Sequence, residues 1–171
     1  MGVVIIVGDF GAGKSTYLKN NFLSKTKKKK FVYALMKKDM PNLPYYSDFV
    51  EMVSDGVKVT DSLFVIDEAS TCMPREQPDT RKGGRKGEDA KLILTWFLNA
   101  RKCNNMIFIV YHALEEVPKW LVKYSDYFVR FRTNDMLQYQ VNRFRSFPPI
   151  VQSIQKHPTL PNFKFDIVKI R

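Results

Sequence analysis

Short hydrophobic runs alternate with stretches of helical periodicity along the first two thirds of the chain. Lys14–Leu23 and Asp89–Lys102 have helical character, the second with apolar residues three and four positions apart. The hydrophobic runs are continuous, as in strands that are buried on both faces, and comprise Val3–Val7, Phe31–Met36, Leu63–Ile66 and Met106–Tyr111. This alternation predicts an α/β fold, a three-layer sandwich in which helices cover both faces of a mostly parallel central sheet.

The pattern changes after the fourth run. Tyr127–Phe131 and Leu137–Phe144 alternate in character around a turn-forming stretch, Thr133–Asp135, so we expect an antiparallel hairpin added to the sheet. Four prolines make the following tail irregular, namely Pro148, Pro149, Pro158 and Pro161. With 171 residues and neither a repeat nor a long linker, the chain is expected to form one domain, with its core over about residues 1–135 and hairpin completion and tail over 136–171.

A glycine-rich segment joins the first predicted strand to the first helix. It has the pattern G-x-x-x-x-G-K-[ST], in which glycines turn backbone N–H groups toward phosphate oxygens and the helix N-terminus adds partial positive charge. Lys14 would reach the β- and γ-phosphates, and the Ser15 hydroxyl would bind Mg²⁺. The predicted nucleotide-binding residues are Gly8, Asp9, Phe10, Gly11, Ala12, Gly13, Lys14, Ser15 and Thr16.

Two carboxylates follow the run Leu63–Ile66, at the end of the sheet where parallel α/β proteins bind ligands. We expect Asp67 to hold Mg²⁺ through water, next to Ser15. Glu68 has the chemistry to orient and deprotonate an attacking water, which favours hydrolysis over transfer to another acceptor. The alternative for Glu68 is a structural role, as a helix cap or as the partner of a nearby arginine.

Lys and Arg outnumber Asp and Glu by 28 to 17, so the formal net charge of +11 makes a polyanion the first partner to consider. We predict that a mobile glycine-rich loop before the second helix binds a nucleic-acid backbone without reading bases. The cations of this loop are Arg81, Lys82, Arg85 and Lys86. The alternative is a solvated loop whose charges only aid solubility.

Two further basic segments are less specific. The lysine run Lys25–Lys30 is expected to be a solvated turn. Four arginines alternate as strand residues do, so each pair shares one sheet face that would meet DNA or an acidic protein surface: Arg130 with Arg132, and Arg143 with Arg145.

Several classes of protein are excluded. No apolar stretch approaches the roughly 18 residues that a membrane-spanning helix needs. Cys72 and Cys103 stand far apart and belong to no Cys/His cluster, which argues against a disulfide scaffold and a structural zinc site. We therefore expect a protein of a reducing cytoplasm.

The order of the motifs resembles that of the FtsK/HerA superfamily of ATPases. Within it, the small size is similar to the genome-packaging ATPases of membrane-containing and related icosahedral viruses. The stretch Met73–Arg75 also resembles the Zot-like assembly ATPases of filamentous phages. The resemblance covers about residues 1–135 and rests on three features: Gly8–Ser15, then Leu63–Glu68, then Arg101 ahead of a strand followed by His112.

This resemblance implies an ATP- and Mg²⁺-dependent motor that packages viral DNA, in the host cytoplasm or on the virion. It implies a ring, expected to be a hexamer, and a capsid or virion-vertex protein as a further partner. A neighbouring subunit would supply an arginine finger that stabilises charge on the transferring phosphoryl group. Arg101 is the first candidate, with Arg75, Arg81 and Arg85 as alternatives. His112 would sense the γ-phosphate, at a position where these families often have Gln or Asn, or would be a structural histidine.

Two other functions fit the same motifs. A small P-loop nucleoside or nucleotide kinase would use the segment Arg81–Arg85 as its lid. A nucleotide-switched virion assembly factor would bind the nucleotide without needing Glu68 for catalysis. Steady hydrolysis without an acceptor, stimulated by DNA, distinguishes the motor from the kinase. Glu68→Gln distinguishes it from the switch, because the substitution should trap bound ATP in an ATPase and leave a switch unaffected.

Overall fold

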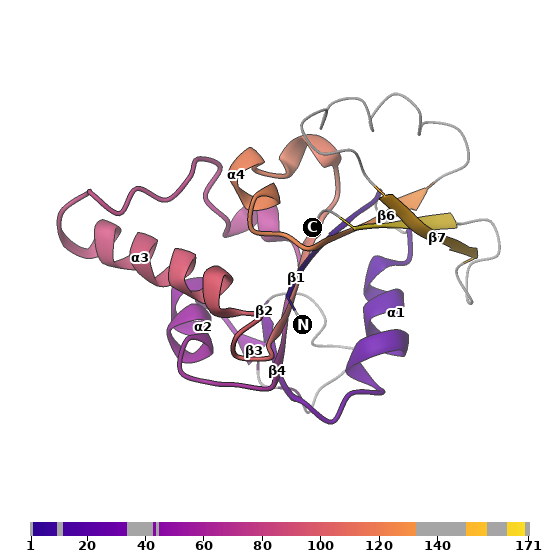
Figure 1. The fold of residues 1–171 in the computed structure, drawn as a ribbon, viewed down its shortest axis with the longest axis horizontal. Helices are drawn as coiled ribbons and strands as arrows, with labels where there is room; N and C mark the ends of the chain where they lie inside the picture. The colour runs from indigo at the N-terminus through magenta and orange to yellow at the C-terminus, as the bar shows by residue number, and fades with distance from the viewer. Residues whose placement is uncertain are drawn as a thin grey trace.

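Eight strands form one sheet within the part of the chain that the computed structural model describes, which is residues 2–9, 12–33, 43, 45–132, 150–156 and 164–169. Their order across the sheet is β3-β2-β4-β5-β1-β6-β8-β7 (Figure 1). In chain order they are β1 Val3–Val7, β2 Lys29–Tyr33, β3 Tyr45–Tyr46, β4 Ser62–Ile66, β5 Met106–Tyr111, β6 Tyr127–Arg132, β7 Ile150–Lys156 and β8 Lys164–Lys169. β1, β4 and β5 agree with the predicted runs to within one residue. β2 begins two residues before its predicted start, and residues 34–36 of that run lie outside the described ranges.

The helices are short apart from one. They are α1 Lys14–Leu18, continued by the π-helix η1 Lys19–Leu23, then α2 Phe49–Gly56, the 3-10 helix η3 Ala69–Thr71, α3 Gly84–Asn99, the 3-10 helix η4 Leu114–Glu116 and α4 Lys119–Val122. The predicted helix Lys14–Leu23 is confirmed. Among the described residues, no helix combines the length and hydrophobicity needed to cross a bilayer.

The start of α3 corrects the sequence prediction. The helix begins at Gly84 instead of Asp89, so Arg85 and Lys86 belong to its first turn and the predicted mobile loop is wrong from Gly84 onward. Gly84 has a φ of +64°, and a Cβ on Gly87 would lie 1.8 Å from the Lys82 carbonyl oxygen. These glycines let the chain fold back closely onto the helix, which a pattern of flexible residues alone does not reveal.

Six neighbouring strands, from β3 to β6 in the sheet order, run parallel. The register places Val7 opposite Tyr111 and Ile66 opposite Ile109. The carboxyl ends of these strands therefore lie together, and we call this the carboxyl end of the sheet; the opposite side is the amino end. Residues that directly follow β1, β4 and β5 meet at the carboxyl end.

Two hydrophobic cores lie on opposite faces of the sheet. Alternate residues of β1 divide between them: Ile5 packs with α2, α3 and α4, whereas Ile6 packs with α1 and η1. Figure 1 shows the same division, with α1 on one side of the sheet and the other three helices on the opposite side. The three-layer α/β arrangement predicted from the hydrophobic runs is confirmed.

The larger core depends on an aromatic contact between α3 and the sheet. Trp96 is 1% exposed and meets Phe64 of β4 edge to face, with ring centroids 5.0 Å apart. A Cβ on Gly56 would lie 2.6 Å from Trp96 Nε1, so the end of α2 fits closely against the indole ring. Within the described residues Nε1 has no hydrogen-bond partner. The ring therefore stabilises this face through its apolar area.

The antiparallel strands come from later in the chain than the sequence predicts. β6 lies between β1, to which it is parallel, and β8, to which it is antiparallel, and β8 also pairs with β7. The expected hairpin of Tyr127–Phe131 with Leu137–Phe144 is not shown, because residues 133–149 lie outside the described ranges and β8 is the antiparallel neighbour of β6. The four tail prolines also lie outside those ranges.

We expect Trp96→Ala to lower the free energy of unfolding by about 3–5 kcal/mol, because it removes a fully buried ring and leaves a cavity. Trp96→Phe should retain most of the stability, since Nε1 makes no hydrogen bond. Urea unfolding followed by circular dichroism measures both. Leu98→Ala is the control on the same helix, because Leu98 is 62% exposed, and it should change stability little. Equal effects at positions 96 and 98 would contradict this description of the core.

Candidate active site

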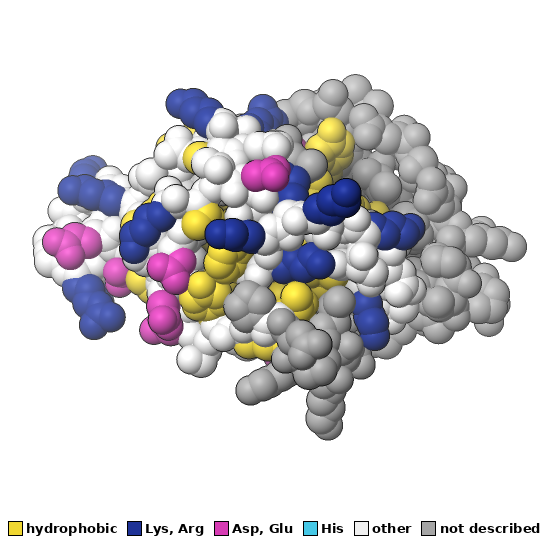
Figure 2. Space-filling model, turned by 90° about the horizontal axis from the view of Figure 1, so that it is seen from below, with side chains coloured by type: hydrophobic (Ala, Val, Ile, Leu, Met, Phe, Trp, Pro, Cys, Tyr) yellow, Lys and Arg dark blue, Asp and Glu magenta, His cyan; other side chains and the backbone are white. Residues whose placement is uncertain are grey.

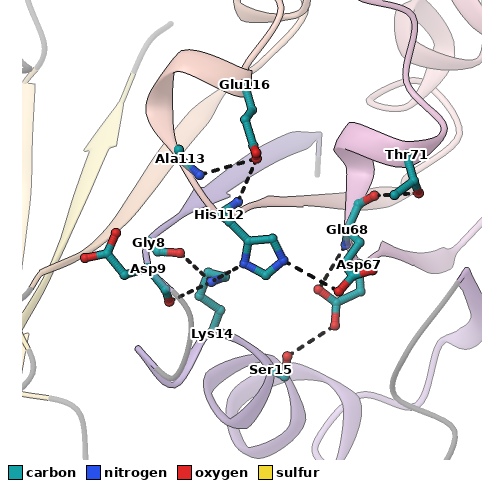
Figure 3. A network of polar contacts seen from close by, with 10 residues as sticks. All are labelled: Gly8, Asp9, Lys14, Ser15, Asp67, Glu68, Thr71, His112, Ala113 and Glu116. Atoms are coloured by element: carbon teal, nitrogen blue, oxygen red, sulfur yellow. Dashed lines mark hydrogen bonds and ion pairs between the residues drawn. The ribbon is translucent and has the colours of Figure 1, made fainter.

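Polar side chains from three segments converge at the carboxyl end of the sheet (Figure 3). The first segment follows β1 and enters α1, the second follows β4, and the third follows β5. Because the strands are parallel and in register, these segments lie side by side although more than a hundred residues separate the first from the last. The residues brought together are Gly8, Asp9, Lys14, Ser15, Asp67, Glu68, His112 and Glu116.

The glycine-rich segment turns sharply into α1. Gly13 has a φ of 87°, a left-handed conformation that favours glycine, and the Ala12 N–H donates to the Asp9 carbonyl at 3.1 Å. A Cβ on Gly8 would lie 2.6 Å from the Phe131 side chain, so β6 approaches this turn closely. Phe10 and Gly11 lie outside the described residues, and Thr16 is half-buried on α1.

Lys14 is only 5% exposed, and protein hydrogen-bond acceptors surround its ammonium group. Nζ donates to the carbonyl oxygens of Gly8 and Asp9, the latter at 3.0 Å, and lies 3.2 Å from His112 Nδ1. Burial lowers the pKa of Lys14, and the nearby carboxylates, Asp67 first among them, oppose that shift. An anionic phosphate beside Nζ would favour the charged form further.

Ser15 and Asp67 face each other across the site. The Ser15 hydroxyl donates to Asp67 Oδ2 at 3.2 Å, and the Glu68 N–H donates to Asp67 Oδ1 at 3.2 Å. Asp67 is 5% exposed, and burial raises the pKa of its carboxyl group, while the Ser15 hydrogen bond opposes the shift. A cation placed here would compensate the buried carboxylate.

This pair of oxygen donors fits Mg²⁺. Magnesium keeps several waters and is bound in nucleotide sites by one or two protein oxygens together with substrate phosphates. A cage of several acidic or histidine ligands is not required, and among the described residues no group of three or more His, Cys, Asp and Glu could hold a metal ion. Ser15 and Asp67 are therefore the residues that would hold the ion.

Glu68 has a strained backbone. Its φ and ψ are 52° and 47°, in the left-handed region that residues other than glycine rarely adopt. The turn is held by Thr71, whose N–H and hydroxyl donate to the Glu68 carbonyl at 3.0 and 2.9 Å. The Glu68 side chain makes no capping hydrogen bond to η3. Instead, the carboxylate extends into the network of Figure 3.

His112 lies between Lys14 and Glu68. Its Nδ1 faces Lys14 Nζ, and its Nε2 lies 3.6 Å from Glu68 Oε1. With the lysine donating to Nδ1, the ring proton belongs on Nε2, where it points to the carboxylate. His112 thus connects Lys14, the lysine predicted to bind phosphates, to the candidate base Glu68, as the predicted sensor of the γ-phosphate would have to do.

Glu116 belongs to the network although sequence reasoning missed it. Its Oε2 accepts from the N–H groups of His112 and Ala113 at 3.2 and 3.4 Å, which fixes the turn that carries the imidazole. The available signal was an acidic pair, Glu115 and Glu116, shortly after a buried strand at the ligand-binding end of the sheet.

Arg101 is not brought to this site. It follows α3 at the amino end of the sheet, where its guanidinium forms an ion pair with the buried Asp126 carboxylate. Asp126 in turn accepts from the Val3 N–H at 2.8 Å. Within its own chain, Arg101 therefore supports the starts of β1 and β6. It can act as a finger only on the site of another copy.

The other candidate arginines lie nearer the carboxyl end. Arg75 is exposed and lines a groove of about 750 Å³ that also includes Glu116 and Trp120. Arg81 is exposed and its Nε lies 3.2 Å from Asp79, whereas Arg85 is in the first turn of α3. The four cations predicted to contact nucleic acid are all exposed in the structure: Arg81, Lys82, Arg85 and Lys86. Arg130 is buried on β6, and Arg143 and Arg145 lie outside the described residues.

Comparison with solved structures finds the same fold in viral packaging enzymes. The genome packaging NTPase B204 from Sulfolobus turreted icosahedral virus 2 in complex with ATP-gammaS is 17% identical, with a TM-score of 0.55 over 85% of this chain and 80% of that one. B204, the DNA-packaging ATPase from Sulfolobus Turreted Icosahedral Virus, gives 0.53 at 15% identity over 85% and 81% of the two chains. The N-terminal domain of zonular occludens toxin from Neisseria meningitidis gives 0.50 at 15% identity over 80% and 79%.

The resemblance to packaging ATPases and Zot-like proteins that the sequence motifs indicate is thus confirmed in the fold. No protein-family model matches the chain, and no curated protein sequence matches it either. At these identities the likeness concerns the fold alone.

We expect Asp67→Asn to weaken Mg²⁺-dependent nucleotide binding by about 10- to 100-fold, the usual effect of losing an outer-shell metal partner. It should also raise the free energy of unfolding of the nucleotide-free protein. The reason is that a carboxyl group with a raised pKa in the folded state loses stability as the pH rises through that pKa, and the amide never ionises. Titration with a fluorescent nucleotide, with and without Mg²⁺, and urea unfolding measure the two effects.

Glu76→Gln is the control for Asp67→Asn, because Glu76 is an exposed carboxylate at the same end of the sheet. It should change neither quantity. If Asp67→Asn destabilised the protein and left the Mg²⁺ dependence unchanged, Asp67 would be a structural residue.

Proposed function

We propose that the protein is a Mg²⁺-dependent ATPase that moves viral DNA. The observation that carries the hydrolytic part is the connected set Lys14, His112 and Glu68 next to the Ser15–Asp67 pair. Lysine and magnesium bind phosphates in kinases and hydrolases alike, and the proposal assigns Glu68 as the base for a water nucleophile.

In the proposed reaction Lys14 binds the β- and γ-phosphates, leaving the loop carbonyls that it contacts in the nucleotide-free structure. Ser15 and Asp67 hold Mg²⁺, which supplies positive charge to the phosphate oxygens when bound. Glu68 orients a water and accepts its proton as the oxygen attacks the γ-phosphorus, giving ADP and inorganic phosphate. When Lys14 moves to the phosphates on ATP binding, before the chemical step, His112 loses its contact with Lys14 and is available to the γ-phosphate.

The DNA-moving part is supported by charge and by the fold. The net charge of +11 suits a polyanion, and the structural relatives include proteins described as DNA-packaging and genome-packaging enzymes. The exposed cations Arg81, Lys82, Arg85 and Lys86 at the start of α3 are proposed to contact the DNA backbone.

We further propose that copies assemble into a ring, a hexamer, that acts in the host cytoplasm or docked on a capsid or virion vertex. Arg75, exposed beside the groove at the carboxyl end, is a candidate for the finger. Arg101 reaches a site only if the amino end of one copy meets the carboxyl end of the next. Such a head-to-tail contact is the type that closes into rings.

Two variants separate binding from hydrolysis. Lys14→Ala should abolish tight ATP binding, because the phosphates lose their buried cation. Glu68→Gln should retain ATP binding and lower the steady hydrolysis rate by about 100-fold or more, since the amide cannot accept the proton of water. Equilibrium binding of a labelled ATP and release of inorganic phosphate, measured over a range of protein concentrations with and without duplex DNA, test both.

Glu115→Gln is the matched control, because Glu115 is an exposed carboxylate of η4, next to Glu116, and is not among the residues of the network in Figure 3. It should leave both quantities unchanged. Turnover that requires a nucleoside acceptor would identify a kinase instead, and full activity of Glu68→Gln in virion assembly would identify a nucleotide-binding switch. A rate per subunit that rises with protein concentration is the result expected if a finger comes from a neighbour.

A further inference from the structure

Charge is unevenly distributed between the two ends of the sheet. In the described loops at the carboxyl end, residues 8–9, 12–14, 67–83 and 112–118, seven acidic side chains stand against four cations. The acidic residues are Asp9, Asp67, Glu68, Glu76, Asp79, Glu115 and Glu116, and the cations are Lys14, Arg75, Arg81 and Lys82, with Arg85 and Lys86 following in the first turn of α3. At the amino end, the segments 24–29, 57–61, 100–105 and 123–126 carry Asp61 and Asp126 against Lys25, Lys27, Lys28, Lys29, Lys58, Arg101, Lys102 and Lys123. A long polyanion is therefore attracted most strongly to the amino end.

Both carboxylates of the amino end are already engaged inside the protein. Asp61 pairs with Lys28, and Asp126 pairs with Arg101. Five lysines are exposed, and none of them forms an ion pair with another described residue: Lys25, Lys27, Lys29, Lys102 and Lys123. We call these five residues the basic platform.

The loops that carry the platform are fixed to one another. Lys28 Nζ donates to the Asn104 carbonyl and contacts Asp61, while Asn104 Nδ2 donates to Asp61 Oδ1 at 2.8 Å. The Asp61 N–H donates to the Cys103 carbonyl at 2.8 Å. Asp61 and Asn104 both have left-handed backbones, with φ of 52° and 54°. A platform that is ordered before binding loses less conformational freedom when it binds.

Figure 2 views the molecule from the side where the connections into β2 and β4 lie. Lys and Arg side chains occupy the middle of this face, whereas most of the visible Asp and Glu side chains lie toward α3 at the left. The positive charge is thus spread over a surface instead of being gathered in a pocket. A spread of exposed lysines suits an extended backbone of phosphates better than it suits a small anion.

We propose that the basic platform binds the phosphate backbone of nucleic acid, at the end of the molecule opposite the nucleotide site. This inference deepens the proposed function, on which it rests for the choice of nucleic acid among polyanions. It differs from the contact expected at the start of α3, and it assigns the lysine run Lys25–Lys30 a role beyond that of a solvated turn. The basic platform and the proposed nucleotide site then lie at opposite ends of the same strands.

The composition of the surface favours nucleic acid over two other occupants. Protein interfaces are depleted in lysine, which favours nucleic acid over the acidic carboxyl end of a second copy and, with it, Arg75 over Arg101 as the finger. Stable attachment to an anionic membrane needs hydrophobic anchors besides charge. Leu98 is the large hydrophobic side chain that stands exposed among the described residues, and a single leucine supplies little of that anchoring.

The test compares two double variants of the full chain that remove the same charge. K25Q/K27Q alters the platform, and K91Q/K119Q alters exposed cations elsewhere. Arg101 and Lys28 are left intact because their ion pairs support the fold. Affinity for a fluorescent 30-base-pair DNA is measured without nucleotide over a series of salt concentrations. Loss of two phosphate contacts should lower the slope of log affinity against log salt by about 1.8 and weaken binding about tenfold or more.

The control variant should change the slope little. Equal changes in the two variants, or an unchanged slope for the platform variant, would overturn the proposal. It would also be overturned if the platform variant kept its DNA affinity while losing self-association in sedimentation, or while losing binding to phosphatidylserine vesicles. Because no ATP is present, a wild-type protein that binds DNA through the platform and hydrolyses no ATP would refute the ATPase and leave the platform standing.

Discussion

Burial of the Lys14 ammonium at the carboxyl end of a parallel sheet is the constraint on which the site depends. A buried cation needs acceptors on several sides, and here they come from Gly8, Asp9 and His112. Those acceptors are in place because Gly8 follows β1 as His112 follows β5, with Val7 and Tyr111 opposite each other. A slip of one residue in this pairing would turn every side chain of the strand to the wrong face and remove the histidine from the lysine.

The candidate site lowers the stability of the folded protein, and the two hydrophobic cores compensate for this loss. Asp67 is held with a raised pKa, Lys14 with a lowered one, and Glu68 in a strained backbone conformation. Each of these features opposes stability in the nucleotide-free protein, and the phosphate and cation of the proposed function would relieve or use each of them. The fully buried strands and the aromatic contact of Trp96 supply buried apolar area, whose stabilising contribution compensates for the destabilising site.

The same parallel topology gives the molecule two chemically different ends. Every parallel strand begins at the basic amino end and finishes at the carboxyl end, so a five-residue strand such as β1 spans the two in about 17 Å. At its start, the Val3 N–H donates to Asp126, the partner of Arg101, and just past its end the Gly8 carbonyl accepts from Lys14. One short, buried strand therefore joins the basic platform to the proposed nucleotide site.

Local sequence determined the strands β1, β4 and β5, the first helix and the chemistry of Lys14, Ser15, Asp67 and Glu68, because continuous hydrophobic runs and a glycine-rich loop carry their own conformational preferences. Tertiary structure decided what depends on contacts between distant segments. It placed His112 between Lys14 and Glu68, engaged Glu116 in the site, and put Arg101 at the far end with Asp126. It also began α3 at Gly84 and gave β6 an antiparallel neighbour from residues 164–169, since packing and register, not local composition, settle where glycines fold back and which strands pair.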